Sequence, residues 1–205
     1  MPDRLPRLDA RPFHLRAFEA GDLTLVAEAS SDREIPLVSS VPWPFSEEAG
    51  HEFIERQQRL AVDGVGYSFV VADDEGDSGA GSIGLWLRDI DLGRAAVGYW
   101  VVASRRGRGV AATALGRLSR WALLDLGIPR LELAIEPWNV ASIRTAERAG
   151  YVLEGLLRSW VPMGDQRRDV YLFSQVPGDL SFTARSGSIT GQSVPIPHPL
   201  PTFAA

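Results

Sequence analysis

The part of the sequence best suited to chemistry is a short basic turn with two glycines, Arg105 to Thr113. An apolar stretch ending at Val101 and Val102 precedes this turn, and a stretch with helical periodicity follows it. The first N–H groups of a helix have no partner within the helix and lie at the positive end of its dipole. Such a turn is suited to binding phosphate, and Gly107 and Gly109 would let a ligand approach the backbone closely.

The alternative is a glycine-rich loop whose arginines are simply solvated. Two specific nucleotide-binding motifs are excluded. The chain has no GxxxxGK[ST] sequence, which a P-loop requires, and no GxGxxG sequence after the first predicted strand, where a dinucleotide-binding fold would carry it.

A second polar cluster begins at Asn139 and Ser142, after the next predicted strand. Both residue types favour helix N-termini, so these two could simply cap the helix that extends to Ala149.

The elements that must position these residues follow from periodicity and from turn residues. The apolar and alternating patterns predict strands at 13–18, 67–72, 81–87, 95–102, 131–135, 151–160 and 169–176. Helical patterns begin at Gly21, after Ser46, at Gly109 and at Asn139, and Pro36 is expected to break the first of them.

These elements predict one mixed α/β or α+β domain over residues 1–176. The nearly all-apolar strand at 95–102 is expected near the centre of the sheet. Gly127 stands where a helix C-cap is expected, and Gly164-Asp165 is a predicted turn. Residues 177–205 are rich in Ser, Gly, Thr and Pro and are expected to form a poorly ordered or surface-bound tail.

Two motifs in these segments resemble one enzyme family. The run from Arg106 to Ala111 resembles the [Q/R]-x-x-G-x-[G/A] signature of the GNAT acetyltransferases, and the segment from Asn139 to Tyr151 resembles their N-x-x-S-x7-G-[FY] segment. The stretches 97–100 and 151–158 are similar to the RimJ/RimL-like branch, which acetylates protein N-termini, including those of ribosomal proteins. The resemblance covers Phe13 to Val176.

This resemblance implies a GNAT fold. Its central sheet is mixed but mostly antiparallel, with helices on both faces and a V-shaped splay between the two central strands. It also implies an N-acetyltransferase that moves the acetyl group of acetyl-CoA to a primary amine, an α-amino group of a peptide or protein, by direct attack in a ternary complex. No metal is expected, and a homodimer is left open.

In the family, the basic turn binds the pyrophosphate of coenzyme A, and the pantetheine arm fills the splay and pairs with the backbone. The residues that the resemblance assigns to the coenzyme are Val101, Val102, Arg106, Gly107, Arg108, Gly109, Val110, Ala111, Thr113, Asn139 and Ser142. Ser142 is also the expected catalytic acid, because the family's usual tyrosine on this helix is replaced by Ala146.

A catalytic base is harder to identify, because Ala96 and Val161 occupy two positions where the family often carries acids. Glu136, at the end of a predicted strand, is the expected catalytic carboxylate, although it could equally be a solvated charge. The other candidates are Glu132, His51 and Asp169. An α-amino group has a pKa near 8, so it is partly neutral near pH 7 and can react without a strong base.

The expected acceptor contacts are Trp43 and Phe45, in a proline-rich loop where the family builds its acceptor pocket, together with Glu154. A structural salt bridge is the competing role for Glu154. Core packing is the expectation for most of the aromatic residues Trp43, Phe45, Trp86, Trp138 and Trp160.

Three other functions stay open: acylation of a small amine such as an antibiotic, a polyamine or an amino acid; binding of acyl-CoA without catalysis; and transfer of a larger acyl group such as succinyl. Arginines near the acyl group, Arg144 or Arg158, would favour the last of these.

Composition narrows the class of protein further. The chain has 205 residues and no cysteine, so a disulfide framework, a thiolate metal site and a cysteine nucleophile are excluded. All 21 basic residues are arginine, so no lysine can act as a base. A net charge of −5 disfavours direct nucleic-acid binding. With no membrane span or signal peptide recognisable, we expect a cytoplasmic protein.

Overall fold

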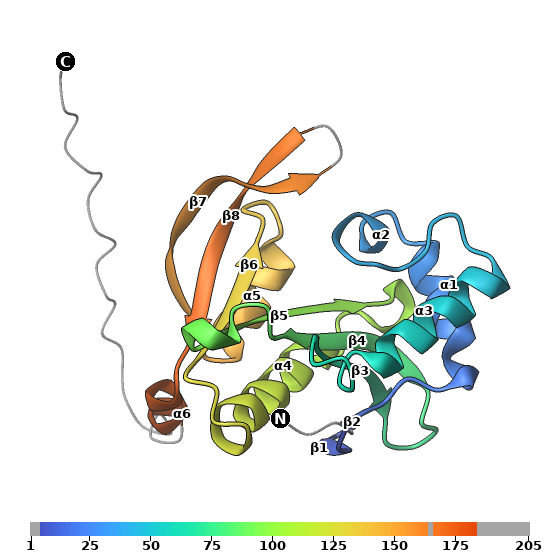
Figure 1. The fold of residues 1–205 in the computed structure, drawn as a ribbon, viewed down its shortest axis with the longest axis horizontal. Coiled ribbons are helices and arrows are strands. Elements are labelled where there is room, and N and C mark those ends of the chain that lie inside the picture. The colour runs from blue at the N-terminus through green and yellow to red at the C-terminus, as the bar shows by residue number, and fades with distance from the viewer. Residues whose placement is uncertain (1–4, 164–165, 184–205) are drawn as a thin grey trace.

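The computed structural model describes residues 5–163 and 166–183. In this part of the chain, eight strands form one sheet in the order β1-β2-β3-β4-β5-β6-β8-β7 (Figure 1). The strands are β1 (Leu8–Ala10), β2 (Phe13–Arg16), β3 (Gly66–Asp73), β4 (Gly79–Trp86), β5 (Arg94–Val101), β6 (Arg130–Ile135), β7 (Val152–Met163) and β8 (Gln166–Gln175). The helices are α1 (Leu23–Ser30), α2 (Ile35–Val38), α3 (Glu47–Arg59), α4 (Val110–Arg120), α5 (Val140–Arg148) and α6 (Pro177–Thr183).

All neighbouring strands run antiparallel except β5 and β6, which are parallel. The mixed, mostly antiparallel sheet with helices is therefore confirmed, and β5 lies near its centre as expected. Figure 1 shows the β7–β8 hairpin at the upper left of the view and α2 at the upper right.

Side-chain alternation along the strands gives the sheet two distinct faces. On one face, Ile83, Val97 and Leu133 belong to the core that includes Leu115 and Leu118 of α4. The other face carries a second core, formed mainly by residues of α1, α3 and β3. In β5, and in β4 from Ile83 onward, odd-numbered residues thus point toward α4 and even-numbered residues point to the opposite face. At the start of β4 the order is reversed, because Ala80 lies in the first core and a Cβ on Gly79 would meet Leu25.

The two central strands separate after a short paired segment. β5 and β6 pair only at Arg94 with Arg130, Ala95 with Leu131 and Ala96 with Glu132. Beyond these pairs, β5 continues against β4 and β6 continues against β8. This divergence is the V-shaped splay that the resemblance to the GNAT acetyltransferases implied.

Two predicted helix-capping residues are found at helix ends in the structure. Gly127 has a left-handed φ of +67° after the end of the α4 segment, in agreement with its predicted capping role. The Asn139 side chain accepts a hydrogen bond from the Ser142 N–H at 3.0 Å and so caps α5. The capping interpretation of Asn139 is confirmed.

Two local predictions were wrong, and two local features were not anticipated. The strand expected at 13–18 ends at Arg16, and the three-residue strand β1 was missed. Pro36 does not break a helix but stands in the first turn of α2, where a missing N–H costs nothing. The helix that begins at Val110 continues from Trp121 to Asp125 as a π-helical turn.

Some predictions concern residues outside the described part of the chain. The turn at Gly164-Asp165 lies there, and so does the tail from residue 184 onward, while α6 forms the start of that tail. Within residues 5–163 and 166–183, no helix is long and apolar enough to span a bilayer. The same residues contain no group of three or more His, Asp or Glu side chains placed to hold a metal ion.

Candidate active site

A cavity of about 740 Å³ follows the splay. Its walls come from β5, the end of β6, the turn before α4, the first turn of α4, and one side of α5 as far as Arg148, with α2 on another side. It therefore brings together the two polar segments that the sequence singled out, although 25 residues lie between Thr113 and Asn139.

The turn before α4 presents a run of free backbone donors. Arg106 N–H bonds Ala103 and Thr113 N–H bonds Gly109, but among the described residues the six N–H groups from Gly107 to Ala112 have no hydrogen-bond partner. Gly107 and Gly109 have φ values of +77° and +79°, and a Cβ built on either would meet nothing within 4 Å. The loop is thus open, and its donors suit a diphosphate.

Acidic residues on neighbouring elements hold this turn in place. Ser104 N–H donates to Glu28 of α1 at 3.2 Å. The Arg105 guanidinium donates to Asp73 at 3.3 Å and to the Ser78 hydroxyl at 2.9 Å. Arg105 is therefore an anchor between the turn and the β3–β4 connection.

Arg106 is held in the same way. Its Nε donates to the Val101 carbonyl at 3.0 Å, and its Nη2 donates to Asp32 at 2.7 Å. The other carboxylate oxygen of Asp32 accepts the N–H groups of Glu34 and Ile35 at the start of α2. Burial pushes the pKa of Asp32 up, but these N–H groups and Arg106 outweigh it and lower that pKa overall.

Most of the expected coenzyme contacts line the cavity. Those that do are Val101, Arg106, Gly107, Gly109, Val110, Ala111, Asn139 and Ser142. Those that do not are Val102, Arg108 and Thr113. Val102 is buried and its N–H bonds Ala80, whereas Arg108 is exposed beside the cavity.

Two cations that the coenzyme assignment had not included line the same cavity. Arg144 and Arg148 lie on α5, are exposed, and have no ion-pair or hydrogen-bond partner in the described part of the chain. Arg105 and Arg106 are already paired with carboxylates. The free positive charge available to an anion in the cavity is therefore on α5 as much as on the turn.

Two hydroxyl-bearing residues line the cavity where β5 faces α5. The Tyr99 hydroxyl donates to the Ser142 carbonyl oxygen at 3.3 Å, and both residues line the cavity. Burial raises the pKa of the Tyr99 phenol, and hydrogen bonding with Ser142 and Thr145 offsets part of the rise. The phenol is therefore protonated at neutral pH and can act as a proton donor.

The sequence analysis did not identify Tyr99 as a candidate site residue. It was noted only as part of the motif at 97–100, and the available signal was a hydroxyl within an otherwise apolar central strand. Ala146, the position where the family often has a tyrosine, is fully buried in the core.

Glu136 lines the cavity, and its carboxylate has no partner in the described part of the chain. The other candidate bases do not line it. Glu132 is bound by Arg130 at 2.8 Å, and Asp169 accepts the Ser159 N–H at 2.8 Å. His51 is exposed on α3.

The expected acceptor contacts do not reach the cavity. Trp43 is exposed, and Phe45 packs beside the core under α1 and α3. Glu154 forms two bonds of 2.5 and 2.8 Å to Arg130 and accepts the Ser174 hydroxyl. Arg130 and Ser174 lower the pKa of Glu154 to about 2, as a structural salt bridge would.

The expectation of core packing was wrong for most of the aromatic residues. Trp43, Trp86, Trp138 and Trp160 are between 40% and 77% exposed. Trp86 and Trp138 line the cavity, whereas Trp160 does not.

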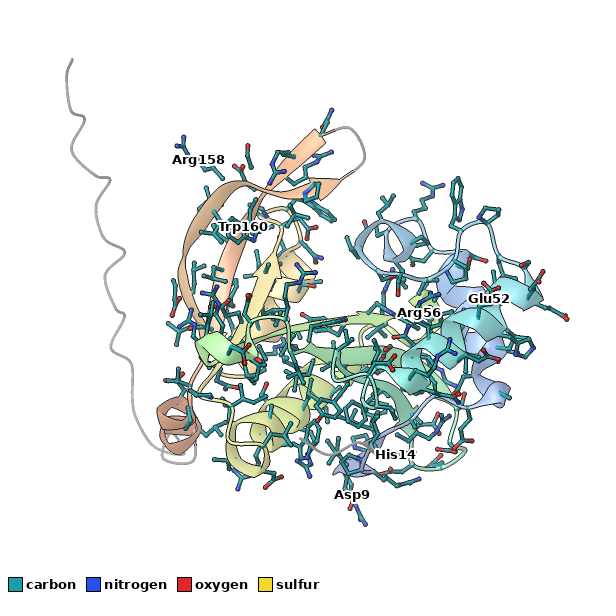
Figure 2. All side chains as sticks on the ribbon, in the orientation of Figure 1. Asp9, His14, Glu52, Arg56, Arg158 and Trp160 are labelled. Atoms are coloured by element: carbon teal, nitrogen blue, oxygen red, sulfur yellow. The ribbon has the colours of Figure 1, made fainter. Side chains whose placement is uncertain are left out.

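Figure 2 shows Trp160 with Arg158 on the β7–β8 hairpin, and Glu52 and Arg56 on α3. The bulge at Ser159, whose φ is +50°, interrupts strand alternation there, which periodicity cannot anticipate.

Comparison with known proteins bears on this arrangement. The chain is 29% identical over 161 residues to the N-acetyltransferase p20 of Bacillus licheniformis. The matched segment covers 78% of this chain and 90% of that protein. Its fold is similar to that of Mycobacterium smegmatis RimJ in complex with CoA-disulfide, with a TM-score of 0.72 and 21% identity over 87% of this chain and 92% of RimJ.

A spermidine N-acetyltransferase chimera from Vibrio cholerae and hSSAT also has a similar fold, with a TM-score of 0.66 and 21% identity over 85% of this chain and 99% of that one. The acetyltransferase (GNAT) domain family matches residues 13–152, more than half of the chain. The open turn with its free N–H groups, the splayed strands and this match agree, and the chain belongs to the GNAT family of acyl-CoA-dependent acetyltransferases.

Proposed function

We propose that this acetyltransferase transfers the acetyl group of acetyl-CoA to the α-amino group of a peptide or protein in a ternary complex. The observation that carries the proposal is the row of six free N–H groups at the start of α4, on a cavity that continues along the splay. Such donors fit the diphosphate of coenzyme A. The rest of the cavity leaves room for an amine.

The reaction forms a C–N bond and breaks a C–S bond. The amine nitrogen attacks the thioester carbonyl carbon, and the thiolate that leaves must take up a proton. We assign that proton to the hydroxyls of Ser142 and Tyr99, because both residues line the cavity and the Tyr99 hydroxyl donates to the Ser142 carbonyl oxygen. The amine loses a proton to water or to Glu136. No acyl-enzyme is needed, and the chain has no cysteine that could form one.

The choice of an α-amino group rests on the fraction of the amine that is neutral, because only a neutral amine can attack the thioester. A group with a pKa of about 7.7–8.0 is roughly one-third neutral near pH 7.5, whereas a lysine amine with a pKa of about 10.4 is neutral in only about one molecule in a thousand. With Glu136 as the single unpaired carboxylate on the β6 side of the described cavity, little base strength is available. An acceptor that is already partly neutral suits this site.

A small cationic amine is the second candidate. Two carboxylates, Glu34 and Glu136, line the cavity without partners among the described residues, and together they would attract a dication.

Thiol release from acetyl-CoA tests the two candidates. We expect release with peptides that have a free α-amino group and little with N-blocked peptides that contain lysine. Mass spectrometry should place the added acetyl group on the N-terminus. Turnover confined to polyamines or other small amines would refute the peptide proposal.

The ion pair between Arg106 and Asp32 leads to a further prediction. Because Arg106 is held by Asp32 and Val101, it stabilises the shape of the turn more than it binds phosphate. Asp32→Asn and Arg106→Gln should therefore each weaken acetyl-CoA binding about 3- to 10-fold. The double variant should bind no more weakly than the single variant with the larger loss, because the effects of two residues that act through one ion pair do not add.

Isothermal titration with acetyl-CoA measures this coupling. Arg33→Gln is the control, because Arg33 is exposed next to Asp32 in the chain and its guanidinium has no partner among the described residues. A loss for Arg106→Gln far larger than for Asp32→Asn would instead make Arg106 a direct phosphate ligand.

A further inference from the structure

The Trp86 side chain packs against two glycines of the sheet. Gly84 precedes it by two residues on β4, and Gly98 pairs with Gly84 from β5. A Cβ added to Gly84 would come within 2.7 Å of the six-membered ring of Trp86, and one added to Gly98 within 3.1 Å. The two glycines thus form a notch in which the indole lies against the sheet.

The indole lies on the face of the sheet opposite α4. Trp86 and Gly98 are even-numbered residues of β4 and β5, so they point away from the core that contains Leu115. Tyr99, by contrast, points toward α5. An acceptor that enters over Trp86 would therefore approach the splay from the side opposite the proposed proton donors.

The other face of the indole borders the cavity. Trp86 is 40% exposed and lines the cavity, and its cross-strand neighbour Ala96 is small and exposed. Further exposed apolar side chains line the same cavity: Leu37 at 65%, Val38 at 54% and Trp138 at 53%. Large apolar surface that is left exposed inside a cavity marks a binding surface.

We propose that Trp86, seated over Gly84 and Gly98, binds an apolar or aromatic first side chain of the acceptor peptide and so determines which N-termini are acetylated. This inference rests on the proposed function. The chemistry that recognises the acceptor is the burial of its first side chain against a fixed indole surface.

The glycine notch fixes the height of this surface above the sheet. A side chain at position 84 or 98 would push the indole outward into the cavity, where it would occupy the space of the acceptor. The two glycines are therefore part of the same specificity device, because they keep the indole low and the cavity open.

The test measures kcat/KM for four peptides of the form X-Ala-Ala-Ala amide, with X as Phe, Leu, Gly or Arg. Wild-type protein should prefer Phe or Leu over Gly by about 10-fold or more, which is the scale at which hydrophobic sites discriminate. Trp86→Ala should reduce that ratio to about 2, mainly by raising the acceptor KM for Phe and Leu. The KM for acetyl-CoA should not change.

Two further variants sharpen the result. Trp160→Ala also removes an exposed indole, but from outside the cavity, and should keep the wild-type ratio. Gly84→Ala keeps Trp86 but displaces its ring, and should lower the ratio even if Trp86→Ala folds poorly. Circular dichroism establishes that each variant is folded.

The possible failures are distinguishable. If wild-type protein acetylates none of the peptides, the proposed function fails. If it acetylates them and both Trp86→Ala and Gly84→Ala leave the ratio of Phe to Gly unchanged, the Trp86 inference alone is overturned. A preference for Arg that disappears in Trp86→Ala would also overturn it, since the indole would then be binding a cation.

Discussion

Gly109→Asp should weaken acetyl-CoA binding at least about 100-fold while the protein stays folded. The substitution places a carboxylate among the free N–H groups where the diphosphate is expected. Two unit charges 4 Å apart repel by about 4 kcal/mol at an effective dielectric constant of 20, and about 2.7 kcal/mol is enough for a 100-fold loss. Isothermal titration calorimetry with acetyl-CoA measures the change.

Matched variants separate the charge from the backbone effect. Gly109 has a φ of +79°, so any side chain there costs roughly 1–2 kcal/mol of stability. Gly109→Ala has this strain without the charge and should lose only a few-fold in affinity. Gly127→Asp adds a carboxylate at a φ of +67° beyond the other end of the α4 segment, with no atom within 4 Å of its Cβ, and should bind normally. Unchanged affinity in folded Gly109→Asp would mean that the coenzyme binds elsewhere.

The second large effect is expected from the two hydroxyls opposite the turn. Ser142→Ala and Tyr99→Phe should each lower kcat about 10-fold, and the double variant about 100- to 1,000-fold, because general-acid catalysis contributes roughly 10²–10⁴. The KM for acetyl-CoA should change little, since neither hydroxyl touches the turn. Burial raises the pKa of Tyr99, so its proton remains available throughout the neutral range.

Pre-steady-state thiol release measures this chemical step, and Tyr171→Phe is the control. Tyr171 is a half-buried tyrosine of β8 that does not line the cavity. If the double variant turns over like the wild type, solvent protonates the thiolate, and the role of Ser142 is limited to the capped first turn of α5.

How far the sequence predicts this molecule depends on how local each feature is. The basic turn, the C-cap at Gly127 and the cap at Asn139 depend on a few consecutive residues, and all three are in the structure. Apolar continuity was enough to predict the central position of β5.

Features set by distant partners escaped prediction. Nothing local indicates that Gly84 pairs with Gly98, so the seat of Trp86 depends on strand register and is invisible in the sequence. The binding of Arg106 by Asp32 joins residues 74 positions apart. The acceptor wall was expected near Trp43, whereas the described cavity is bordered by α2, four residues that begin just before the proline thought to end a helix.

The short pairing of β5 with β6 has a consequence for the motions of the molecule. Among the strands of the described residues, none lies beside that edge of β5 from Val97 onward, and none lies beside the facing edge of β6 from Leu133. Amide protons there should exchange with deuterium quickly in the free protein. A pantetheine amide lying between the strands would slow that exchange. The coenzyme would then supply hydrogen bonds that join the two halves of the sheet.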